Sequence, residues 1–94
     1  MGGRRWTEDE MLVAIFLYRF GRDSLGVPQQ VVAKAMGRSA DALELRLLDL
    51  ASIDKGDESL AGFGQSSPLR EVWNRAKDLP RDLLAKRVRS FLKL

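Results

Sequence analysis

The sequence predicts an all-α fold of about five helices, in one domain that spans residues 1–94. Apolar residues recur at spacings of three and four, no stretch alternates as a strand does, and helix-starting or helix-ending residues separate the apolar stretches. Ninety-four residues suffice for one domain with one core. The pattern predicts a three-helix core in residues 6–52, a loop in residues 53–67 and a C-terminal helix pair in residues 68–94.

The first predicted helix occupies the stretch WTEDEMLVAIFLYRFG. Thr7 suits the N-cap, Glu10 completes a capping box three residues later, and Gly21 suits the C-terminus. Two apolar stripes follow helical spacing, one formed by Met11, Ala14, Ile15 and Tyr18 and the other by Leu12, Phe16 and Phe20. A surface helix needs only one stripe. We therefore expect the second stripe to be a contact surface, covered by the C-terminal helices, which we favour, or by a second copy in a homodimer.

The second and third predicted helices are separated by only two or three residues, a spacing typical of a helix-turn-helix. Pro28 suits the first position of the second helix, and Gly37 suits its end. Ser39 suits the N-cap of the third helix, which we expect to end at about Ala51. Leu43, Leu47 and Leu50 predict the core stripe of the third helix, and Leu45 and Leu48 add a second stripe.

The C-terminal part begins after a loop with three glycines, SIDKGDESLAGFGQSS. Its acids Asp54, Asp57 and Glu58 lack the spacing of a complete EF-hand, so we interpret them as solvated. Ser67 and Pro68 predict the start of the fourth helix, and Pro80 separates it from the fifth. The predicted inner faces are Leu69, Val72, Trp73 and Ala76 in the fourth helix, and Leu84, Val88 and Phe91 in the fifth.

Cysteine and histidine are both absent from the sequence. Their absence excludes disulfides, thiolate and imidazole metal ligands, and catalytic sets that need a histidine base. We therefore expect a protein that is not an enzyme, with no catalytic residues, no metal and no cofactor. The longest apolar run, MLVAIFLY, has eight residues, whereas a bilayer span needs about 20. The sequence predicts a cytoplasmic protein with no membrane partner.

The charges are divided unevenly along the chain. Residues 70–94 hold eight bases and three acids, a net charge of +5, whereas residues 41–58 hold two bases and six acids, a net charge of −4. Lys86, Arg89 and Lys93 recur at helical spacing, with Arg81 and Arg87 nearby, and predict a phosphate-binding edge. A face that is merely solvated is the alternative interpretation.

The start of the third helix offers a second candidate DNA contact, formed by Arg38, Ser39 and Arg46. Arg38 and Ser39 would lie where backbone amides at a helix N-terminus can meet phosphate. In the alternative interpretation Ser39 only caps the helix and Arg38 is solvated. The acids Asp41 and Glu44 would repel phosphate, and together with the surplus leucines they suit a protein contact.

Three stretches, taken in order, resemble a known family. The opening Trp6-Thr7-x-x-Glu10-Met11 resembles the start of the helical domain found ahead of the nuclease domain in some bacterial HNH endonucleases. The stretch GRSADALELRLLDLASID is similar to that family's Gly-Arg-Thr signature, which ends in an aliphatic-Asp pair, here Ile53-Asp54. AGFGQSSPLREVWNR is similar to the glycine-containing loop and Trp-bearing helix that follow. The Trp-Thr-x-x-Glu start is also similar to Myb and SANT domains.

The resemblance spans about residues 4–75 and implies recognition of duplex DNA. It implies that the second helix supports the third against the duplex, in a bacterial or phage protein such as a small regulator or the recognition part of a restriction or defence system. An HNH nuclease needs histidines to bind metal and activate water, so nuclease activity is not implied. The leading prediction is a non-enzymatic DNA-binding domain, and the alternative is a protein-interaction or oligomerisation module.

Overall fold

The computed structural model describes residues 5–56 and 68–94. This part of the chain forms five helices and no strand, which confirms the all-α prediction. The helices are α1 (Glu8–Phe20), α2 (Gln29–Met36), α3 (Ala40–Lys55), α5 (Pro68–Ala76) and α6 (Arg81–Leu92). None of these described helices is long and apolar enough to cross a membrane.

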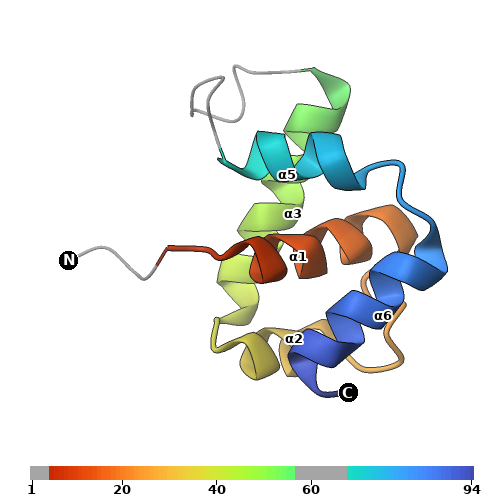
Figure 1. The fold of residues 1–94 in the computed structure, drawn as a ribbon. Helices are drawn as coiled ribbons and strands as arrows, with labels where there is room; N and C mark the ends of the chain where they lie inside the picture. Colours follow the sequence, from red (N-terminus) through yellow and green to blue (C-terminus); the bar gives the residue numbers. More distant parts are fainter. Residues whose placement is uncertain (1–4, 57–67) are drawn as a thin grey trace.

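Helix α1 lies in the middle of the molecule and packs against α3, α5 and α6 (Figure 1). Residues 11–17 are all buried, as expected for a helix that is apolar on every side. Leu12 and Phe16 are buried and Phe20 packs against the core at its edge. Helices α5 and α6 lie over this stripe, which agrees with the favoured expectation that the chain's own C-terminal helices cover Leu12, Phe16 and Phe20.

The helix ends follow the capping chemistry of the sequence. The Thr7 hydroxyl accepts from the Glu10 amide at 3.2 Å, and the Glu10 carboxylate accepts from the Thr7 amide at 2.8 Å, so the predicted capping box is confirmed. Gly37 ends α2 in the left-handed conformation with φ of 77°. The Ser39 hydroxyl accepts from the Ala42 amide at 3.0 Å and caps α3. Pro28 is the N-cap of α2, one position before the predicted one.

Helix α3 extends one turn beyond its predicted end near Ala51. Ser52 and Ile53 are buried, and Gly56, with φ of 75°, ends the helix with its amide donating to the Ile53 carbonyl at 3.1 Å. Burial of Ile53 therefore keeps in the helix a segment that was expected to open the loop. Asp57, Glu58 and Ser67, which the sequence assigns to that loop, lie outside the described residues.

The two C-terminal helices pack mainly on α1 rather than on each other. The predicted inner face of α5 is confirmed, with Leu69, Val72, Trp73 and Ala76 buried. Helix α6 buries Leu84, Val88 and Leu92, whereas Phe91 is exposed, so the prediction for Phe91 is wrong. Helical spacing from Val88 allows either residue 91 or residue 92 to face inward. Ala85 also packs against the core, which turns the buried face toward Leu92.

Tyr18 and Asp54 join the ends of α1 and α3. The Tyr18 hydroxyl donates to the Asp54 carboxylate at 2.7 Å, and its ring meets Trp73 edge-on at a centroid distance of 5.7 Å. Burial, followed by the hydrogen bond to Asp54 and the negative charge of that carboxylate, raises the pKa of Tyr18 to about 12. The neutral phenol is thus the form that the folded chain favours.

We expect an absorbance titration of tyrosinate to give a pKa of about 12 for Tyr18. Tyr18 is the chain's single tyrosine, so the signal is unambiguous. Because the folded pKa of Tyr18 lies above its ordinary value of 10.0, the stabilisation from this group is complete below pH 10 and is lost as pH rises through 12.

The variant Asp54→Asn should move the pKa of Tyr18 part of the way back toward its ordinary value, since burial of the ring remains. Asp41→Asn, on the same helix, should leave the pKa unchanged. An equal shift in both variants would contradict the specific role of Asp54.

Candidate nucleic-acid interface

Arg38, predicted as a DNA contact, is committed to an internal ion pair. Its Nε and Nη2 donate to the two carboxylate oxygens of Glu10, each at 3.1 Å, and the two side chains are only 10% and 3% exposed. The guanidinium also lies over the Trp6 ring at 4.8 Å and donates to the Arg5 carbonyl at 2.8 Å. Arg38 therefore ties the turn before α3 to the start of α1, and its predicted contact with DNA stays a prediction.

Ser39 and Arg46, the other two predicted contacts on α3, also have structural partners. The Ser39 hydroxyl is used in capping α3, although the residue itself is exposed. Arg46 donates to Asp49 at 2.7 Å and lies over the Trp6 ring at 5.0 Å. Trp6 thus lies within reach of two guanidinium groups. The Arg46 guanidinium, which also pairs with Asp49, has partners within the described residues.

The exposed side of α3 carries acids and leucines instead. Leu45 and Leu48 are 60% and 55% exposed, and Asp41 lies exposed one turn before Leu45. Glu44 accepts hydrogen bonds from Arg22 at 2.6 and 3.1 Å and from Gln29 at 3.2 Å. The bond from Arg22, and then that from Gln29, lower the pKa of Glu44. Of these two acids, Glu44 is therefore paired with a base, whereas Asp41 forms no ion pair within the described residues.

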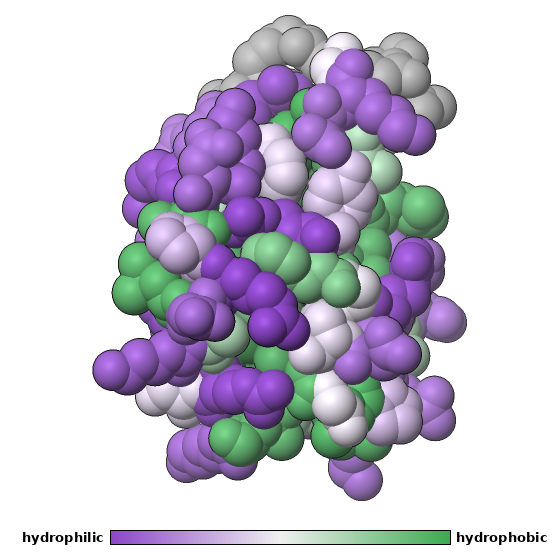
Figure 2. Space-filling view, turned by 90° about the vertical axis from the view of Figure 1, so that its right-hand side faces the viewer, coloured by the Kyte–Doolittle hydropathy of each residue, from purple (hydrophilic) through white to green (hydrophobic). Residues whose placement is uncertain are grey.

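Helix α6 and its C-cap bring three exposed bases together at helical spacing. Lys86, Arg89 and Lys93 are exposed and recur at helical spacing, and none of them forms an ion pair within residues 5–56 and 68–94. Arg89 makes one long hydrogen bond, at 3.4 Å, to the Leu25 carbonyl. We call Lys86, Arg89 and Lys93 the basic face. Figure 2 shows the side of the molecule that carries the α5–α6 connection, with hydrophilic and hydrophobic side chains interleaved over it.

The other two predicted bases of α6 are engaged with the core. Arg81 lies over the aromatic pair of Phe16 and Phe20, at 5.8 and 5.6 Å from their centroids. Arg87 pairs with Asp9 at 3.3 Å and with Glu8 at 3.8 Å. The predicted phosphate-binding edge is therefore narrower than the sequence suggested, because Arg81 and Arg87 stabilise the packing of α6 on α1.

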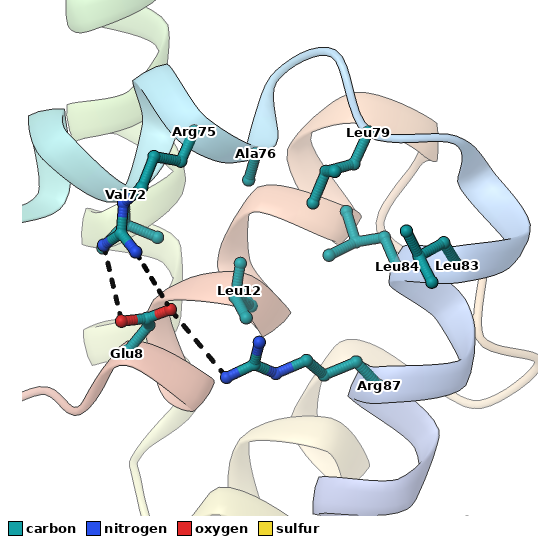
Figure 3. Close-up of a pocket in the computed structure, with 9 residues that line it drawn as sticks. All are labelled: Glu8, Leu12, Val72, Arg75, Ala76, Leu79, Leu83, Leu84 and Arg87. Atoms are coloured by element: carbon teal, nitrogen blue, oxygen red, sulfur yellow. Dashed lines mark hydrogen bonds and ion pairs between the residues drawn. The ribbon is translucent and has the colours of Figure 1, made fainter.

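A pocket of about 300 Å³ opens between α1, α5 and α6. Its walls are apolar, with Leu12, Val72 and Leu84 among them, and Arg75 and Arg87 reach Glu8 from two sides across its opening (Figure 3). The charged groups balance one another, and a ligand would have to break these ion pairs to reach them. Within the described ranges no three His, Cys, Asp or Glu side chains gather to hold a metal ion.

Sequence reasoning missed three residues that decide which bases are free. The sequence pattern predicted only that Glu10 completes the capping box and assigned no contacts to Trp6 or Glu8. Glu10 and Glu8 pair with arginines 28 and 67 or more positions away. Local spacing carries no signal for such contacts. The excess of bases over acids in residues 70–94 was the one sequence signal that some of these arginines pair with acids elsewhere in the chain.

Comparison of the chain with protein-family models, with curated proteins and with solved structures gave no match. The resemblance to the helical domain of HNH endonucleases, and the helix-turn-helix role of α2 and α3, therefore stay predictions.

Proposed function

We propose that this chain is a non-enzymatic, cytoplasmic DNA-binding domain that holds the phosphates of duplex DNA with the basic face of α6. The observation that carries the proposal is the set of three exposed bases, Lys86, Arg89 and Lys93, outside any ion pair of the described chain. Cations in such positions gain the most from contact with phosphate, since no internal partner has to be released.

The contrast with α3 supports this choice of helix. The bases at the start of α3 are held by Glu10 and Asp49, and its open side is acidic. The family resemblance implied that the third helix faces the duplex, whereas the distribution of exposed charge favours α6 as the helix that contacts DNA. The mode of binding proposed here is contact with the backbone, which depends weakly on DNA sequence.

Changing Lys86, Arg89 and Lys93 together to glutamine should weaken binding to a random duplex and flatten its dependence on salt. Three released counterions correspond to a slope of about −2.7 in a plot of log K against log salt concentration, and the triple variant should show a slope near zero. Fluorescence anisotropy between about 50 and 200 mM salt measures both quantities.

The matched control is the triple variant Lys34→Gln, Lys55→Gln and Lys77→Gln. It removes the same charge from exposed positions on α2, α3 and the α5–α6 connection. The control should bind nearly as tightly as the parent chain. Equal losses in the two variants would show a dependence on net charge alone, and an unaltered slope in the α6 variant would refute this interface.

A second candidate function is protein interaction. The specific observation that favours it is the pair of leucines on α3, Leu45 and Leu48, whose side chains are more than half exposed. Large apolar side chains in so open a position are typical of a contact surface. This candidate uses α3, and not the stripe on α1 that the sequence suggested.

A further inference from the structure

We propose that copies of this chain associate head to tail, with the exposed leucines of α3 in one copy docked into a basic groove beside α6 of the next. The leucine face consists of Asp41, Glu44, Leu45 and Leu48. The basic groove is lined by Asp9, Leu83, Lys86, Arg87, Ser90 and Phe91. The inference goes beyond DNA binding and does not depend on it.

The leucine face consists of side chains that project from one side of α3 and could insert into a groove on a partner. Leu45 and Leu48 are three positions apart, and Asp41 precedes Leu45 by four, so all three project from one side of α3. The core of α3 uses a different stripe, formed by Leu43, Leu47 and Leu50. Anchors at this spacing are what a helix presents to a groove on a partner.

The groove beside α6 has the form of a receptor. Its volume is about 570 Å³, and it adjoins the pocket of about 300 Å³ through the shared residues Leu83 and Arg87. Leu83 is 56% exposed and Phe91 stands open at the other end of the groove. A cavity of about 150 Å³ already accepts a ligand of benzene size, so each hollow has room for a leucine side chain.

The charges of the two surfaces are opposite. On the leucine face Glu44 is already paired with Arg22, whereas Asp41 forms no ion pair with the described residues and supplies the free negative charge. The groove carries Lys86, which also has no ion pair within those residues, and Arg87, which divides its contacts between Glu8 and Asp9. Docking would give Asp41 and Lys86 partners of opposite charge while the leucines are covered.

A single copy cannot bring its own two surfaces together. Helix α1 packs against both α3 and α6 and lies between them, and α3 and α6 are not a packed pair (Figure 1). The leucine face of one copy therefore meets the groove of another. Two different surfaces joined in this way leave one of each free, so association continues beyond the dimer.

Two variants with matched chemistry test this arrangement. Leu45→Gln with Leu48→Gln blocks the leucine face, and Leu83→Gln with Phe91→Gln blocks the groove. The control, Val31→Gln with Leu94→Gln, changes two exposed apolar residues that belong to neither surface. All four residues of the blocking variants are exposed, so circular dichroism and melting temperature should match those of the parent.

Sedimentation velocity at rising concentration gives the decisive result. The parent and the control should form species larger than a dimer, and high salt should weaken them. Each blocked variant should lose affinity by about tenfold or more for each large apolar side chain removed from the contact, and should sediment as a monomer. An equimolar mixture of the two blocked variants should form a dimer and nothing larger, since it retains one intact leucine face and one intact groove. A monomeric parent, assembly that stops at a dimer, or a mixture that stays monomeric would overturn the proposal.

Discussion

Replacing Trp73 by alanine is expected to lower the free energy of unfolding by about 3 to 5 kcal/mol. Trp73 is buried on the inner face of α5, where its ring meets Tyr18 edge-on at 5.7 Å. A helix of nine residues such as α5 is too short to be stable alone, so it depends on this packing. Because small domains have total stabilities of about 5 to 15 kcal/mol, the variant should lie close to its unfolding limit.

Chemical denaturation followed by the fluorescence of Trp6, the other tryptophan of the chain, measures the effect in the variant. Trp73→Phe should cost much less, because a ring still meets Tyr18. Leu83→Ala, at an exposed position on α6, should change stability by less than about 0.5 kcal/mol. If Trp73→Ala and Leu83→Ala had similar small costs, the assigned burial of the indole would be wrong.

Replacing Arg38 by leucine is the second change with a large expected effect, a loss of about 3 to 5 kcal/mol. The substitution leaves the Glu10 carboxylate, whose side chain is 3% exposed, without the guanidinium that contacts both of its oxygens. An uncompensated buried charge costs more than the ion pair contributed. The Glu10 carboxylate would keep its bond from the Thr7 amide but would lose the positive charge beside it.

A double-mutant cycle separates this cause from simple loss of contact area. Glu10→Gln keeps a side chain that can complete a capping box, and it removes the charge. The variant with both Glu10→Gln and Arg38→Leu should therefore be more stable than Arg38→Leu alone. Arg22→Leu, which breaks the exposed pair with Glu44, should cost at most about 1 kcal/mol. Additive losses at Glu10 and Arg38 would show that the two side chains are not coupled.

Most of the fold could be predicted from the sequence because its determinants are local. The capping box at Thr7, the glycine at position 37 and the cap at Ser39 act within a few residues, and the apolar spacing of Leu43, Leu47 and Leu50 marks a buried face. The errors arose where tertiary packing, rather than local sequence, determines where a helix ends or which of its faces is buried. Helix α3 continues to Lys55 because Ile53 is buried, and Leu92 rather than Phe91 is buried on α6.

The candidate site was predicted less well for a related reason. Counting charges shows how many bases a segment has, but not which of them have internal partners. Nothing in the sequence distinguishes Lys86, which has no ion pair among the described residues, from the arginines that have internal partners. Arg38 lies against Glu10. Arg81 lies over Phe16 and Phe20, and Arg87 lies between Glu8 and Asp9. These partners come from distant positions and become neighbours only when α1 is packed.

The shared use of Glu10 has a consequence for the motions of the folded chain. The first turn of a helix ordinarily frays open on its own, at little cost in free energy. Here the carboxylate that closes the first turn of α1 also holds Arg38 from the turn before α3, so that turn cannot open without releasing contacts 28 residues away. The start of α1 therefore belongs to the same cooperative unit as the α2–α3 turn. The end of α6, where Lys93 is the C-cap in a left-handed conformation, is held by different contacts, namely the burial of Leu92 and the hydrogen bond from Arg89 to the Leu25 carbonyl.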